Sequence, residues 1–126
     1  MKRIAIIDVG SNSARLVIME IHASNACNLV YNQKDPLRLA LKTDKKGYLT
    51  EEAFAATTNC LKNFASMCRI FQVDETIAVA TAAIRNAPNG AKLAKAASQA
   101  SGINLEIISG KTEAYLSYLG VINTID

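Results

Sequence analysis

The sequence predicts an α/β domain with a five-stranded mixed sheet, helices on its faces and the element order βββαβαβα. Three short apolar runs separated by turn residues come first, which is typical of an antiparallel meander. Short apolar runs then alternate with segments of helical periodicity, which is typical of parallel strands joined by crossover helices. A chain of 126 residues is long enough for one such domain with a buried core.

The meander is predicted from three apolar runs. Residues 3–8 (RIAIID) and 15–22 (RLVIMEIH) are expected as the first two strands. A third strand starts within residues 28–34 (NLVYNQK) and could reach Leu41. Pro36 lies in that stretch and cannot donate a backbone hydrogen bond, so this strand should lie at an edge or be broken there.

The rest of the chain predicts helices that alternate with two further strands. Thr50 is a favourable N-cap, and Glu51 and Glu52 in the first turn suit the helix dipole. Right-handed crossovers would place both later strands beside the first strand. The expected elements are a helix over 50–71, a strand over 76–81, a turn over 86–90, a helix over 91–101, a strand over 104–108, and a last helix that follows Gly110 and ends at about Gly120.

Composition narrows the class of protein. The formal net charge is only +3 and no run of five like charges occurs, so a nucleic-acid partner is not expected. Cys27, Cys60 and Cys68 form no CxxC, and His22 is the single histidine, so we expect buried thiols in a reducing compartment and no zinc site. The first apolar run is too short for a signal peptide or a membrane span, which predicts a cytoplasmic protein without a membrane partner.

A polar stretch after the first strand is a candidate phosphate loop. In AIIDVGSNSARLV, Asp8 ends a predicted buried strand, where a carboxylate needs a hydrogen bond or a cation. Gly10 lets the backbone approach a ligand, and Ser11, Asn12 and Ser13 add side-chain donors to the backbone N–H groups of a turn. An ordinary hairpin turn uses the same residue types. The chain lacks GxxxxGK[ST] and GxGxxG, so any bound phosphate would not lie on a P-loop or a Rossmann turn.

Two more stretches follow apolar strands in the same way. Arg85 comes after TAAI, and its planar fork suits a phosphate oxygen or a carboxylate, although it could be a surface arginine near a helix start. Glu113 lies in ISGKTEA, where it could instead complement a helix dipole. Because the carboxyl ends of the central strands share one edge of the sheet, Asp8, Arg85 and Glu113 are expected to face one cleft.

These stretches resemble the exopolyphosphatase and guanosine pentaphosphatase family of the sugar kinase, Hsp70 and actin superfamily. The loop D-x-G-S-N-S is more specific than the general superfamily loop, and TAAIRNAPNG, EIISGKTEAYLSYLGV and LTEEAF…CLKNFA resemble further segments in the same order. The resemblance implies a ribonuclease H-like, actin-like ATPase fold. Residues 1–126 would be the first of two such domains, and no D-x-G-G-G-S loop of the second occurs in this sequence.

The resemblance also implies a reaction and its residues. The family hydrolyses the terminal phosphoanhydride of inorganic polyphosphate or guanosine pentaphosphate with Mg²⁺. By position, Glu113 would orient or deprotonate the attacking water, and Arg85 would bind the phosphoryl group. Asp8 would help to hold Mg²⁺, partly through water. The phosphate would be cradled by Gly10, Ser11, Asn12 and Ser13.

One departure leaves alternatives open. The family segment usually has two adjacent glutamates, and here Thr112 replaces the first, which bears on rate and substrate. The chain could therefore be a non-catalytic phosphate-binding or regulatory domain, or a kinase or ATPase of the same superfamily. The second actin-like domain is an expected partner within the full-length chain, which could also form a homodimer. Alone, this half of a cleft is expected to be weakly active or inactive.

Overall fold

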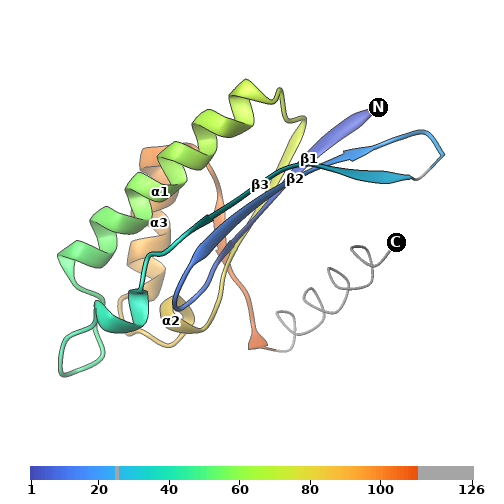
Figure 1. The fold of residues 1–126 in the computed structure, drawn as a ribbon. Helices are drawn as coiled ribbons and strands as arrows, with labels where there is room; N and C mark the ends of the chain where they lie inside the picture. The colour runs from blue at the N-terminus through green and yellow to red at the C-terminus, as the bar shows by residue number, and fades with distance from the viewer. Residues whose placement is uncertain (25, 111–126) are drawn as a thin grey trace.

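The computed structural model describes residues 1–24 and 26–110, which form a five-stranded sheet with helices packed against it (Figure 1). The predicted last helix, with Thr112 and Glu113, lies outside the described residues. The elements in chain order are β1 (Lys2–Val9), β2 (Ala14–Ile21), β3 (Cys27–Asp35), the 3-10 helix η1 (Leu39–Leu41), α1 (Glu51–Ile70), β4 (Glu75–Ala80), α2 (Ala82–Arg85), α3 (Gly90–Ser101) and β5 (Leu105–Ile107).

The sheet has the strand order β3-β2-β1-β4-β5. β1 pairs antiparallel with β2, and β2 pairs antiparallel with β3, so the predicted meander is confirmed. β4 lies parallel to β1, as the crossover rule predicted, and β5 lies parallel to β4. The expectation that both later strands lie beside β1 is therefore correct for β4 and wrong for β5, which is separated from β1 by β4. The carboxyl ends of β1, β4 and β5 therefore lie along one edge of the sheet.

The third strand ends before Leu41, the last residue to which it was expected to extend. β3 is an edge strand that stops at Asp35, directly before Pro36, so the extension to Leu41 is wrong. Proline lacks the N–H that a ladder needs. Beyond it, Leu37 and Leu39 are buried and the chain turns into η1 rather than remaining extended.

The long predicted helix is confirmed almost to the residue. The Thr50 hydroxyl caps α1 by accepting a hydrogen bond from the Ala53 N–H at 3.3 Å. α1 and α3 cover one face of the sheet (Figure 1). The core between the sheet and these helices includes Ala5, Ile7, Val9, Leu16, Ile18, Leu61, Phe64, Leu93 and Ala97.

The described residues cover the other face of the sheet less completely. Alternate residues of a strand point to opposite faces, so Ile6 and Asp8 share the side that Ala5 and Ile7 do not. Ile6 is 44% exposed, Ile77 on the neighbouring β4 is 46% exposed, and Asp8 is exposed as well. The expectation of a buried Asp8 is therefore wrong, and the argument from desolvation does not apply to its carboxylate.

The cysteines do not all behave as predicted. Cys60 is buried and Cys68 is partly buried, but Cys27 is exposed at the start of the edge strand β3. Burial raises the pKa of the Cys60 thiol to about 12, and the nearby Asp35 carboxylate acts in the same direction. Cys60 is therefore a neutral core side chain, whereas Cys27 is open to solvent.

Candidate functional site

The segments that follow β1, β4 and β5 are joined by hydrogen bonds at the carboxyl edge of the sheet. The Thr81 N–H and hydroxyl both donate to the Val9 carbonyl, at 3.1 and 3.3 Å. The Ile108 N–H donates to the Ala80 carbonyl at 3.1 Å. Thr81 is only 3% exposed, so it links the ends of β1 and β4 from inside the protein.

Arg85 is held at this edge by a one-turn helix that the sequence pattern did not reveal. Its N–H donates to the Thr81 carbonyl at 2.9 Å, within α2 and its cap. Its guanidinium donates to the Ile108 carbonyl at 3.0 Å, just beyond β5. Gly110 lies next to the same group, since a Cβ there would be 3.9 Å from Arg85 Nη2. The half-buried Arg85 thus bridges two strand ends and reaches the segment that leads to Glu113.

The polar loop after β1 is a hairpin turn. The Gly10 N–H donates to the Ser13 carbonyl at 2.9 Å, which leaves Ser11 and Asn12 at the tip. The Gly10 N–H is therefore used within the turn. The lack of a side chain at Gly10 has a local reason, because a Cβ there would lie 3.3 Å from the Ser13 carbonyl oxygen and 3.9 Å from Thr81 Oγ1. The loop consequently packs directly beside the segment that carries Arg85.

The hairpin still offers backbone donors for an anion. The Ser11 and Asn12 carbonyls accept hydrogen bonds from the N–H groups of Ala40 and Arg38, at 3.0 and 2.8 Å. In a trans peptide the N–H points away from the C=O, so the N–H groups of Asn12 and Ser13 point away from residues 38–40. Across residues 1–24 and 26–110, neither donates to another backbone group. Successive N–H groups of a turn can form an anion-binding concavity, so the hairpin and phosphate-loop interpretations are compatible.

Contacts within the described residues link two of the predicted site elements. The loop 10–13 and Arg85 are brought to the same edge through Thr81. Asp8 lies on the less covered face, where the register places it beside Arg15 of β2 and Val79 of β4. Glu113 lies outside the described residues. The pattern of the sequence did not single out Thr81, although a threonine directly after an apolar strand is the signal that could have found it.

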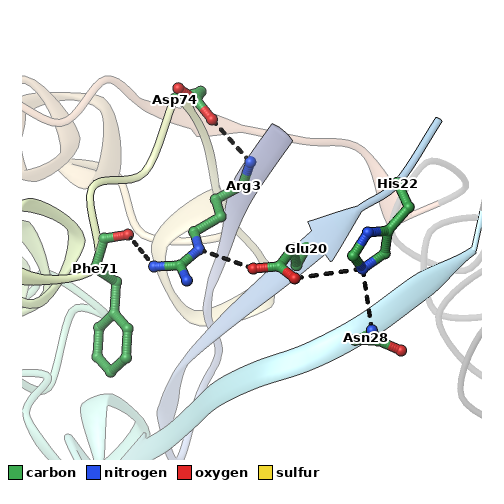
Figure 2. Close-up of polar contacts among 6 residues, drawn as sticks. All are labelled: Arg3, Glu20, His22, Asn28, Phe71 and Asp74. Atoms are coloured by element: carbon green, nitrogen blue, oxygen red, sulfur yellow. Dashed lines mark hydrogen bonds and ion pairs between the residues drawn. The ribbon is translucent and has the colours of Figure 1, made fainter. Parts of the chain in front are cut away.

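A polar network at the opposite end of the sheet has a different role (Figure 2). Arg3 donates to Glu20 at 3.1 Å and to the Phe71 carbonyl at 2.7 Å, while its N–H donates to Asp74 at 2.8 Å. Glu20 also contacts His22 at 3.3 Å. These bonds tie the start of β1 to β2 and to the turn after α1. Within the described part of the chain, no three His, Cys, Asp or Glu side chains are grouped as metal ligands.

The fold and the loop define the class of protein. A meander, two parallel strands that continue the sheet from its first strand, and a polar hairpin at the carboxyl edge form an actin-like α/β domain. The crystal structure of the Ppx/GppA family member from Aquifex aeolicus superposes with a TM-score of 0.88 at 30% identity, over 97% of this chain and 40% of that chain. The predicted fold class is confirmed.

The sequence comparisons identify the family. The sequence model of the Ppx/GppA phosphatase family matches residues 17–126. The chain belongs to the Ppx/GppA phosphatase family. It is 32% identical to a putative exopolyphosphatase of Haemophilus influenzae, over 98% of this chain and 38% of that protein. It is also 33% identical to a bifunctional 3-dehydroquinate synthase/phosphatase of Fusobacterium nucleatum, over 97% of this chain and 19% of that protein.

The chain is short beside these relatives, because it spans between 19% and 40% of their lengths. Among the described residues, no helix is both long enough and apolar enough to cross a membrane.

Proposed function

We propose that the protein carrying this chain is a phosphohydrolase that removes the terminal phosphate of inorganic polyphosphate or guanosine pentaphosphate. The observation that carries the proposal is the loop 10–13, whose N–H groups at Asn12 and Ser13 point away from their backbone neighbours, beside Arg85 at one edge of the sheet. Phosphoryl transfer depends mainly on positioning and on electrostatic stabilisation of the transferred group. Membership of a phosphatase family, together with similarity to a putative exopolyphosphatase of Haemophilus influenzae, supports this reaction class.

Each residue has a proposed role. The loop residues Gly10, Ser11, Asn12 and Ser13 hold the phosphate, and the Arg85 guanidinium offsets charge on the transferred group. Glu113 orients or deprotonates the attacking water. Asp8 helps to hold Mg²⁺, and its exposed carboxylate fits this role because magnesium keeps several waters and binds through few carboxylates together with substrate phosphates. The ion would neutralise phosphate charge.

The remainder of the cleft is proposed to come from a second actin-like domain. The chain covers 38% of the Haemophilus relative, which leaves ample length for such a domain in a protein of similar size. The substrate would then lie between the loop 10–13 and that domain. A homodimer of the full-length protein is compatible with this arrangement.

The test is phosphate release by the full-length protein with Mg²⁺. Long-chain polyphosphate, guanosine pentaphosphate and ATP are compared side by side. We expect release from at least one of the first two, with a loss of about 10²- to 10⁴-fold in Glu113→Gln, because a general base contributes about that factor. Glu106→Gln is the matched control, since Glu106 is an exposed glutamate on β5 in the same chain segment. It should retain the wild-type rate.

Two outcomes would contradict the proposal. Release only from ATP would indicate a kinase or ATPase of the superfamily. Binding of polyphosphate without release would favour a regulatory phosphate-binding domain, which the Thr112 departure keeps as the second candidate. In that case Thr112→Glu is the first variant to test for recovered turnover.

A further inference from the structure

A second arginine lies against the candidate phosphate loop and takes no part in the roles described above. The Arg38 N–H donates to the Asn12 carbonyl at 2.8 Å, and two residues later the Ala40 N–H donates to the Ser11 carbonyl at 3.0 Å. Arg85 approaches the loop through Thr81 and Gly10, whereas Arg38 approaches it at the tip. Figure 1 shows the β1–β2 hairpin, η1 and α2 gathered at the same end of the sheet.

The backbone at Arg38 is anchored on both sides. Leu37 is 5% exposed and Leu39 is fully buried, while Arg38 between them is exposed. The Lys42 ammonium donates to the Leu37 carbonyl at 2.6 Å and fixes the segment further. In the described part of the chain, no hydrogen bond or ion pair of the Arg38 guanidinium is found. The Arg38 side chain is thus a solvent-exposed cation whose backbone is anchored beside the loop.

The backbone conformation of Arg38 indicates that its side chain has a role. Its φ of 53° and ψ of 46° place it in the left-handed region, which disfavours residues with a Cβ and suits glycine. An arginine there makes the fold less stable than a glycine would. Non-glycine residues in this conformation are found preferentially at ligand-binding positions, and here the exposed guanidinium is the group that could bind.

We propose that Arg38 is a substrate-binding residue that holds an inner phosphate of a polyphosphate chain whose terminal phosphate lies on loop 10–13. This inference rests on the proposed function of that loop. A guanidinium binds two phosphate oxygens through parallel N–H groups, and a linear polyphosphate repeats a negative charge at every phosphate. Arg85 then acts on the terminal phosphate, and Arg38 adds affinity for the chain that extends beyond it.

The test compares Arg38→Gly and Arg38→Gln in the full-length protein. Glycine removes the charge and suits the left-handed backbone, so the fold is kept, while glutamine removes the charge and keeps the Cβ. We expect both to raise KM for long-chain polyphosphate about tenfold, the effect of one charge-assisted phosphate contact, with kcat unchanged. KM should also depend less steeply on salt. Lys45→Gln is the control, because it removes one charge from the exposed loop that ends at Leu49.

The outcomes are separable. An unchanged KM in Arg38→Gly overturns the proposal, and so does an equal rise in Lys45→Gln, because the effect would then be one of net charge. A rise of KM in Arg38→Gly but not in Arg38→Gln would assign the effect to the backbone, which would also overturn the proposal. If the wild-type protein binds long-chain polyphosphate but does not hydrolyse it, tenfold weaker binding by Arg38→Gly supports the role of Arg38 while the hydrolytic function fails. If the wild type binds no polyphosphate, the role of Arg38 fails, whereas the hydrolytic function is then decided by phosphate release from guanosine pentaphosphate.

Discussion

Gly90→Ala tests how closely α3 is packed against α2. Gly90 is buried at the start of α3, and a Cβ on it would lie 1.8 Å from the Ile84 carbonyl oxygen and 2.8 Å from the Ile84 carbonyl carbon. Both atoms belong to the backbone of α2, so no side-chain rotation relieves the clash. The two helices would have to separate by more than about 1 Å before the contact became tolerable.

The expected change in stability has a definite sign. Alanine is a better helix former than glycine, which alone would stabilise α3 by about 1 kcal/mol. Overpacking against a backbone that cannot rotate away costs about 3 kcal/mol. We therefore expect a net destabilisation of about 2 kcal/mol. Because Ile84 precedes Arg85, the same displacement should move the guanidinium and lower phosphate release.

Amide hydrogen exchange of α3 in the full-length protein measures this effect. A loss of about 2 kcal/mol corresponds to about thirtyfold faster exchange of its protected amides. Gly102→Ala is the control, because nothing lies within 4 Å of a Cβ there and only its φ of 79° is unfavourable. That variant should lose only about 1 kcal/mol. Slower exchange in Gly90→Ala would refute the steric argument and show that the higher helix propensity of alanine outweighs the clash.

Three further predictions concern the scaffold. Thr57 is fully buried in α1 and its hydroxyl has no hydrogen-bond partner among the described residues, so Thr57→Val should stabilise by about 1 kcal/mol and raise the urea midpoint. Asn89 accepts from the Leu49 N–H at 2.9 Å and donates to the Leu49 carbonyl at 3.0 Å, so Asn89→Ala should lower the unfolding free energy by about 2 kcal/mol, and an unchanged urea midpoint would contradict this. The folded-state pKa of Cys60, about 12, exceeds its ordinary value of 9.0, so the unfolded chain ionises first as pH rises. The free energy of unfolding should therefore be unaffected by the ionisation of Cys60 below pH 9 and should fall by about 1.4 kcal/mol per pH unit above it. Cys60→Ala should lack this fall in a titration of stability against pH.

The elements with strong local signals were predictable from the sequence. Thr50 and the acidic first turn indicated where α1 begins, and apolar periodicity carried the helix to its end. The three strands of the meander and the parallel placement of β4 and β5 followed from apolar runs and the handedness of crossovers. These features depend on neighbours in the sequence or on general rules of chain connection.

Other features depend on contacts between distant segments. α2 and η1 are each about one turn long, which is too short for periodicity to be visible. The run RIAIID is apolar on both faces, so it does not reveal that Asp8 lies on the less covered one. The candidate loop and Arg85 could be found from residue types, whereas Arg38 could not, because its link to Asn12 is a backbone hydrogen bond that any residue type except proline could make.

Arg85 donates a hydrogen bond to the Ile108 carbonyl, which follows β5. β5 has only three residues and is the shortest strand described. During synthesis the meander and α1 can form from contacts that are local in sequence, yet this hydrogen bond of the guanidinium forms only after residues 105–108 have emerged. An edge strand this short opens locally at lower free energy than the whole domain unfolds. Denaturant or heat should therefore break the hydrogen bond between Arg85 and Ile108 while most of the sheet is still folded.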